Sequence, residues 1–232
     1  MIIYGKNTVL EAINNNKKIT KLYLTKQASL TLKLPKNIDV TITSLKEMDK
    51  ICDGNHQGYI AVVDEYSYYE LDEVILSLQN KDNVSIAILD SIEDPHNLGA
   101  ILRSADASGI DAIIIPKNHA VKLNSTVAKV STGAIEYVKV IQVTNLVNAI
   151  NKLKDHGYWI SGLDMNGDIS YTNHDYSGKI AVIIGNEGKG ISRLVKEQCD
   201  YLLSIPMVGH VNSLNASVSA ALVFYEILRN RK

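Results

Sequence analysis

Polar side chains that could do chemistry gather in three segments of the chain, each of which follows a short apolar run. The first segment, residues 90–109, carries Asn97 and Arg103 on a predicted helix that Gly109 can end. The helical repeat brings Asn97 and Arg103 near the same mouth. The alternative is a plain N-terminal cap at Asn97 and an arginine that faces solvent. A separate apolar stripe of this helix consists of Leu98, Ile101, Leu102 and Ala105.

The second segment, residues 184–192, is rich in glycine. Three glycines in six residues, starting at Gly185, permit positive φ angles and expose backbone N–H groups, as a loop that wraps a ligand requires. Glu187 adds a carboxylate to this loop. The spacing is not that of a P-loop, and no GxGxxG pattern follows a predicted strand. A tight strand-to-helix turn without a ligand is the alternative.

The third segment, residues 203–221, runs through a Pro and Gly bend into a helix of small residues. Asn212, Ser213 and Asn215 stand together where this helix is expected to begin. Capping by Ser213 is the simple explanation, but one polar side chain would suffice for a cap. The cluster therefore favours a binding or catalytic role.

A regular scaffold must bring these segments together, and the chain from residue 84 onward predicts one. Short apolar runs alternate with helical patterns, which is typical of a mostly parallel sheet covered by helices on both faces. Ligands of such α/β folds bind beyond the carboxyl ends of the strands, where the three segments are expected. The predicted strands are 84–89, 112–115, 138–141, 159–163, 180–184 and 202–205, and the predicted helices are 98–108, 125–132, 146–154, 192–198 and 213–229.

A smaller α/β unit is predicted to precede this domain. Residues 1–66 contain a short helical pattern at 7–13 and apolar alternation that predicts strands, after which 67–82 is a polar linker with a short helix at 71–78. The large domain then spans 83–232. The strands expected in the small unit are 19–25, 38–43 and 59–63.

Charge is uneven along the chain, although its formal sum is only −1. Residues 1–50 hold nine lysines against four acidic residues. The lysines are at positions 6, 17, 18, 21, 26, 33, 36, 46 and 50. This excess indicates either a solvated lysine face or a surface that docks RNA.

Several classes of protein are disfavoured by composition. No basic leader with an apolar core opens the chain and no run of about 18 apolar residues occurs, so we expect a cytoplasmic protein without a membrane partner. Cys52 and Cys199 are far apart and form no CxxC pair, so reduced thiols are expected rather than a disulfide or a zinc site.

Taken in order, the three segments resemble the motifs of the SpoU (TrmH-like) branch of the SPOUT RNA methyltransferases: N-x-G-x-x-x-R-S, G-N-E-G-x-G and I-P-x-x-G-x-x-x-S-L-N-x-S. The resemblance covers roughly residues 84–232. The N-terminal part, with His56-Gln57-Gly58 near its end, resembles the family's L30e-like substrate-binding domain. The sequences D-P-H-N-L-G-A from Asp94 and I-P-M from Ile205 are typical of the subgroup that methylates a guanosine of 23S rRNA.

The resemblance implies a C-terminal domain tied in a trefoil knot, a homodimer, a structured RNA substrate and no metal. It implies S-adenosylmethionine as the cofactor, held by main-chain groups near Gly185, Ile205 and Leu214 with Leu163 close by. It also implies a catalytic set in which Arg103 acts together with Asn97, Glu187, Ser213 and Asn215.

The chemistry of the residues leaves the proton acceptor open. His96 or His210 would be chosen from pKa alone, because histidine titrates near neutrality. Arg103 is an awkward base because its guanidinium stays protonated, so we expect it mainly to hold the target phosphate and ribose. Glu187 is either catalytic or an anchor of its loop.

Rival functions also stay open. The same chemistry could act on tRNA, or on the rRNA site whose methylation protects against an antibiotic. A catalytically silent RNA-binding dimer would be expected to have lost Arg103, Asn97 or the polar residues of the third motif, and all of these are present. An α/β dehydrogenase is disfavoured because the dinucleotide fingerprint is missing.

Overall fold

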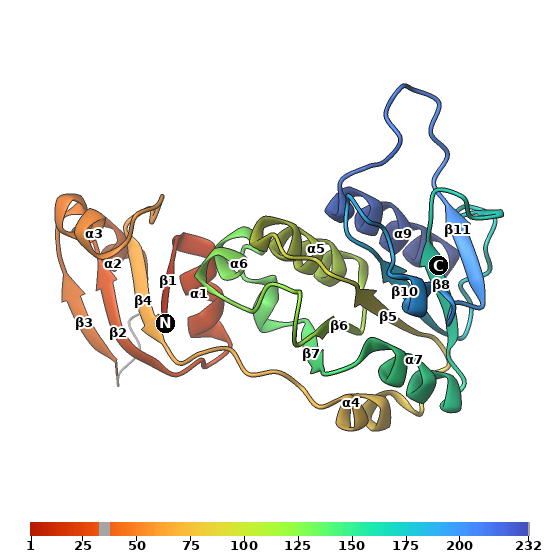
Figure 1. Cartoon of the computed structure of the whole chain (residues 1–232). Helices are drawn as coiled ribbons and strands as arrows, with labels where there is room; N and C mark the ends of the chain where they lie inside the picture. Colours follow the sequence, from red (N-terminus) through yellow and green to blue (C-terminus); the bar gives the residue numbers. More distant parts are fainter. Residues whose placement is uncertain (33–37, 232) are drawn as a thin grey trace. The chain divides into compact units, whose positions relative to one another are not determined.

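A computed structural model describes residues 1–32 and 38–231, so lysines 33 and 36 of the basic segment lie outside the described residues. The chain divides into two compact units (Figure 1). One comprises Met1–Ser67 together with Lys122–Tyr137, and the other comprises Tyr68–Val121 together with Val138–Lys232. We call them the N-terminal unit and the sheet unit.

The N-terminal unit is built on a mixed sheet that, among the described residues, has four strands in the order β1-β4-β2-β3. Strands β2 and β3 are parallel, and β4 runs antiparallel to both β1 and β2. Its strands are β1 (Ile2–Tyr4), β2 (Ile19–Leu24), β3 (Asp39–Ile42) and β4 (Tyr59–Val63). Its helices are α1 (Lys6–Asn14), α2 (Lys26–Thr31), α3 (Leu45–Ile51), α6 (Ser125–Val130) and the 3₁₀ turn η1 (Ala134–Glu136).

Helix α6 comes from a segment far along the chain, yet it packs inside this unit. The Lys129 Nζ donates a hydrogen bond to the Asn55 carbonyl over 2.9 Å, and Thr8 donates to the Ala128 carbonyl over 3.4 Å. Helix α3 is fixed at its start by a capping box between Ser44 and Glu47. The Lys129–Asn55 hydrogen bond thus ties the loop before β4 to α6.

The sheet unit carries a parallel sheet that, within the described part of the chain, has seven strands in the order β7-β6-β5-β10-β8-β11-β9. The strands are β5 (Val84–Leu89), β6 (Ala112–Pro116), β7 (Lys139–Val143), β8 (Trp159–Leu163), β9 (Ile169–Ser170), β10 (Lys179–Ile184) and β11 (Tyr201–Ser204). The helices are α4 (Leu71–Leu78), α5 (Pro95–Ser108), α7 (Leu146–Asp155), α8 (Arg193–Lys196) and α9 (Ala216–Asn230).

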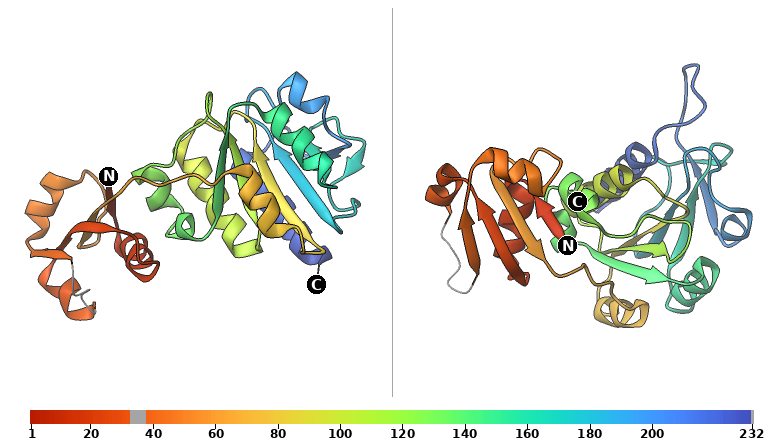
Figure 2. Two further views of the ribbon diagram at one scale, coloured as in Figure 1. Left: turned by 90° about the horizontal axis from the view of Figure 1, so that it is seen from below. Right: turned by 60° about the vertical axis from the view of Figure 1, so that its left-hand side comes forward.

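Helices cover both faces of this sheet (Figures 1 and 2). Apolar side chains of α4 and α7, such as Ile75 and Ile150, join one buried cluster with strand residues such as Ile86 and Ile183. Helices α5 and α9 pack against each other, and α9 also lies against β10. The apolar stripe predicted for α5 is buried, since Ile101 and its partners are at most 1% exposed. The predicted α/β class is therefore confirmed.

Most predicted elements are present with shifts of a few residues, and the helix expected at 71–78 is α4 itself. Sequence patterns missed β1, α2, α3 and β9, all of which are short. Among the described residues no helix is long and apolar enough to span a bilayer. Both cysteines are free, and burial raises the pKa of Cys199 to about 11, with Asp200 adding to the shift.

Candidate functional site

A cavity of ≈ 390 Å³ opens beyond the carboxyl ends of β8, β10 and β11, which are neighbours in the sheet. Ligands of parallel α/β sheets bind at this edge. The four residues predicted to hold a cofactor line it: Leu163, Gly185, Ile205 and Leu214. Glu187 and Ser213 line it as well.

The glycine-rich loop after β10 is folded tightly on itself beside the cavity. Asn186 and Gly190 exchange backbone hydrogen bonds of 3.1 and 2.8 Å. A methyl group on Gly185 would lie 2.3 Å from the Gly190 carbonyl carbon, so only glycine fits there. The Asn186 side chain donates to the Ser91 carbonyl over 3.0 Å and accepts from Gly188 over 2.9 Å. These contacts with its own backbone and with Ser91 define the shape of the loop.

Asp90, at the end of β5, fixes the far end of this loop. The buried carboxylate accepts the Ser192 N–H over 2.7 Å and the Ser91 hydroxyl over 3.0 Å. Sequence reasoning did not assign Asp90 a role. An acidic residue that directly follows a predominantly apolar strand is the signal that could have identified it.

Glu187 joins the three predicted segments at one atom. Its Oε1 accepts hydrogen bonds from Asn97 Nδ2 at 2.6 Å, Asn215 Nδ2 at 2.7 Å and the Ala216 N–H at 3.3 Å. Asn215 Nδ2 also donates to Asn97 Oδ1 over 2.9 Å. Residues far apart in sequence therefore meet beside the cavity, and Glu187 acts at least as an anchor between its own loop, α5 and α9.

Two helix starts differ from the sequence prediction. Helix α5 is capped by Asp94, which accepts the His96 N–H, and Pro95 occupies its first position. Asn97 therefore lies inside the first turn, 7% exposed, and its side chain is free to reach Glu187. Helix α9 is capped by Asn215 rather than Ser213, so Asn215 is both a cap and a member of the network.

Arg103 does not line the cavity and is exposed on α5. Within the described part of the chain its guanidinium has no recorded hydrogen-bond or ion-pair partner, so it is available to an incoming anion. His96 and His210 are exposed and also lie outside the cavity lining. Ser213 is exposed on the loop between β11 and α9, which projects from the sheet unit in Figure 1.

The loop after β8 was not singled out by sequence. It contributes Asp164, Met165 and Asn166 to the cavity wall. Asp164 accepts a hydrogen bond from Lys196 at 2.6 Å and one from the Asn166 N–H at 2.9 Å. Burial alone would raise the pKa of Asp164, but these hydrogen bonds and the Lys196 charge hold it below its usual value. Asp164 thus stays ionised at the cavity wall.

Two family models match the chain. The SpoU rRNA Methylase family matches residues 85–225, and the domain for RNA 2'-O ribose methyltransferase substrate binding matches residues 2–69. The chain belongs to the SpoU rRNA methylase family. The resemblance inferred from the three motifs is therefore confirmed, and this SpoU methylase is an RNA-methylating enzyme by family.

Curated relatives agree. The SpoU methylase is 45% identical over 239 residues to a TrmH family tRNA/rRNA methyltransferase of Staphylococcus saprophyticus, covering 100% of this chain and 96% of the relative. It is 44% identical over 239 residues to the protein of the same name in Staphylococcus haemolyticus, with the same coverage.

Solved structures share the fold. The SpoU methyltransferase AviRb of Streptomyces viridochromogenes matches with a TM-score of 0.83 and 24% identity, over 100% of this chain and 89% of that one. A second structure of AviRb, with a TM-score of 0.81, 23% identity and coverage of 100% and 90%, contains AdoMet, the cofactor predicted from sequence. The TrmH/SpoU tRNA modifying enzyme of A. aeolicus matches with a TM-score of 0.58 and 26% identity, over 69% of this chain and 84% of its own.

Proposed function

We propose that this SpoU methylase transfers the methyl group of S-adenosylmethionine to a ribose 2'-oxygen of structured RNA, with a guanosine of 23S rRNA as its target. The observation that carries the proposal is the convergence of the three motif segments: Glu187 Oε1 binds Asn97 and Asn215 at 2.6 and 2.7 Å on the rim of a cavity. The substrate-binding family match at residues 2–69 supports RNA ribose as the acceptor.

The cavity suits the proposed cofactor. Its ≈ 390 Å³ falls in the range of roughly 300–1,000 Å³ found for small-molecule sites. Apolar side chains of Leu163, Ile205 and Leu214 would cover a flat base, and glycine at position 185 lets the loop after β10 close tightly beside it. When bound there, the cofactor's sulfonium would supply an electrophilic methyl group.

The chain's own residues would then align the acceptor. Methyl transfer is fast when the 2'-oxygen is held in line with the bond from sulfur to the methyl group, because well-oriented groups react as if at very high concentration. The exposed Arg103 guanidinium would hold the target phosphate and ribose, since guanidinium pairs with phosphate in two parallel hydrogen bonds. Asn97, through its hydrogen bond to Glu187, would hold the start of α5 beside the cavity. Ser213, at the cavity wall, would orient the sugar.

The proposal includes a homodimer and a knotted sheet unit. Support for the dimer is an apolar stripe on α9: Val218, Leu222 and Tyr225 are 47%, 36% and 52% exposed. They border a groove that α5 lines with Ala100 and Ser104. The knot is proposed from membership of the SpoU family.

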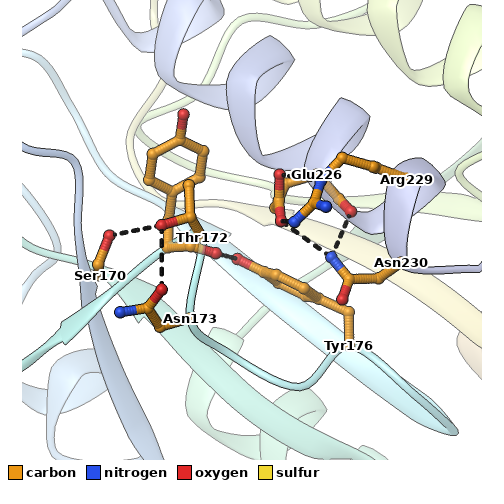
Figure 3. A network of polar contacts seen from close by, with 8 residues as sticks. Ser170, Thr172, Asn173, Tyr176, Glu226, Arg229 and Asn230 are labelled. Carbon is orange, nitrogen blue, oxygen red and sulfur yellow. Dashed lines mark hydrogen bonds and ion pairs between the residues drawn. The ribbon is translucent and has the colours of Figure 1, made fainter.

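Beyond this stripe, the end of α9 is held by its own polar network (Figure 3). Glu226 accepts a hydrogen bond from Arg229 Nε at 3.0 Å and one from Asn230 Nδ2 at 2.9 Å. Tyr176 lies close by and donates its hydroxyl to the Tyr171 carbonyl over 2.7 Å (Figure 3). Glu226 and Arg229 line the same groove as the apolar stripe, so this ion pair would border the contact with a partner copy.

The experiment is a methyl-transfer assay with tritiated S-adenosylmethionine on 23S rRNA, 16S rRNA and tRNA from cells that lack the gene. We expect label in 23S rRNA, alkali resistance of the labelled linkage, and loss of labelling with Arg103→Ala. Label in tRNA alone would move the target to tRNA, in line with the names of the relatives. Cofactor binding without label in any RNA would favour a silent RNA-binding dimer. An rRNA substrate also places the enzyme in the cytoplasm.

A further inference from the structure

A second pocket, which the proposed methyl transfer does not use, lies in the N-terminal unit. It has a volume of ≈ 730 Å³ and lies where β2 and β3 end and β4 begins. Its lining comes from three separate segments, namely the start of α2, helix α3 with the residues before it, and the loop before β4, so the fold builds it rather than one flexible turn. Its lining includes Lys26, Leu45, Asp49, His56 and Gln57.

The floor of the pocket is a buried histidine whose hydrogen bonds define its tautomer. The Gly58 N–H can only donate, and it lies 3.1 Å from His56 Nδ1, so Nδ1 accepts. Nε2 therefore carries the hydrogen and donates to Asp49 Oδ1 over 2.9 Å. His56 is 4% exposed, and Gln57 and Gly58 adopt positive φ angles of 55° and 82° to make this turn. These two hydrogen bonds fix the orientation of the His56 ring, which in turn orients the Asp49 carboxylate.

Asp49 is the one carboxylate among the described residues that line the pocket. Its side chain is 67% exposed although His56 holds one oxygen, so the remaining lone pairs face solvent. A carboxylate accepts two adjacent hydrogen bonds. Among the four RNA bases only guanine presents two adjacent donors, N1–H and N2–H, on its Watson–Crick edge, whereas adenine and cytosine place an acceptor beside their donor.

The surroundings suit the rest of a nucleotide. Leu45 is 57% exposed and offers an apolar surface to the face of a base. Lys26 lines the pocket, and Lys46 and Lys50 stand one helical turn apart on α3, beside Asp49. None of these three lysines has an ion pair recorded within residues 1–32 and 38–231, which leaves them for phosphates.

We infer that this pocket binds one unstacked guanine of the RNA substrate, with Asp49 reading its Watson–Crick edge and the lysines holding the flanking phosphates. This rests on the proposed function only in taking RNA as the substrate. It adds base recognition to a unit whose family description is substrate binding in general. Unpaired bases in loops and bulges are the usual targets of sequence-specific RNA recognition.

The test measures base preference in the full-length protein, without cofactor. Fluorescein-labelled uridine nonamers with a central guanosine, adenosine, cytidine or uridine are titrated by fluorescence anisotropy. We expect the wild-type protein to bind the guanosine oligomer about tenfold more tightly than the adenosine oligomer, the range of a good bidentate contact. Equal affinity for all four centres in the wild-type protein overturns the inference, whatever the variants do.

Asp49→Asn is the diagnostic variant, because its amide oxygen can still accept from His56 while one acceptor becomes a donor. Asp39→Asn is the matched control: Asp39 lies in the same unit outside the pocket lining, its side chain is 66% exposed, and the charge change is identical. Both changes add general affinity by removing a negative charge, so the selectivity ratio is the readout. Asp49→Asn should reduce it to about one, and Asp39→Asn should keep it near tenfold. A preserved ratio in Asp49→Asn refutes the role of this carboxylate.

The two proposals fail separately. Methylation of 23S rRNA with no guanosine preference leaves the methyltransferase proposal standing and removes the pocket. A guanosine preference without methylation of any RNA does the reverse.

Discussion

Replacing Glu187 by alanine separates the two roles that its sequence left open. The change removes the one atom that accepts from Asn97, Asn215 and the Ala216 N–H. Asn215 is exposed, so water can replace its lost partner, but Asn97 is only 7% exposed. A buried donor without a partner costs about 1–3 kcal/mol. We therefore expect Glu187→Ala to destabilise the sheet unit by that amount.

The loss should appear in two assays. In urea denaturation the free energy of unfolding falls by roughly 1–3 kcal/mol, and the thermal midpoint falls by about 2–12 °C. S-adenosylmethionine binding, measured by calorimetry, should weaken about tenfold, because the loops that form the cavity are no longer held in place before binding. Glu187→Gln keeps one acceptor oxygen and should cost about 1 kcal/mol or less.

The matched control is Glu197→Ala in the same unit. Glu197 makes an exposed ion pair with Arg193 at 2.6 Å, and such pairs contribute about 0–1 kcal/mol. Equal destabilisation by Glu187→Ala and Glu197→Ala would refute the anchor reasoning. Loss of turnover in Glu187→Ala with unchanged stability and cofactor affinity would instead make Glu187 a catalytic residue.

Three further predictions concern the same unit. Gly185→Ala should lower the thermal midpoint and weaken cofactor binding at least tenfold, since overpacking costs about 1–3 kcal/mol. Gly188→Ala is the control and should keep the midpoint, because its added methyl group would meet its nearest neighbour at 3.6 Å. Equal midpoints for the two variants would contradict the tight packing at Gly185. Arg103→Ala should slow single-turnover methylation about 100-fold while His96→Ala has little effect, and the reverse result would make the histidine the base. Asp164 has a lowered folded pKa, so its contribution to stability is present above the usual 3.8 and is lost as the pH falls through the folded value. Asp164→Asn should therefore be less stable than wild type in urea at pH 6, and the difference should narrow progressively as the pH falls below 3.8, whereas parallel curves would exclude this linkage.

Local patterns were enough for the long elements. Runs such as Val84–Leu89 and Trp159–Leu163 are apolar throughout or nearly so, and they form the strands β5 and β8 with the predicted bounds. Short elements such as β9, with two residues, carry no periodicity of their own and exist because β11 pairs with them. Secondary structure is predicted from the periodic spacing of apolar residues, and a strand of two residues is too short to show such a period.

The helix starts show where local signals compete. Asn97 and Ser213 are good cap residues by type, but Asp94 precedes Pro95, which is pre-organised for the first turn of a helix. Asn215 takes the second cap because the same side chain can also bind Glu187, a contact that no local rule contains.

The sequence by itself determined the α/β class and the three polar segments, because these depend on residue types at fixed short spacings. The family and the four residues that line the cavity followed from the resemblance of those segments to the SpoU motifs. Tertiary structure decided that Asp90 and Asp164 shape the site, that α6 packs in the N-terminal unit, and that one oxygen of Glu187 joins three segments. Such contacts link residues about 30–120 positions apart, and their geometry follows from strand order and helix packing. Spacing along the chain carries no information about that order.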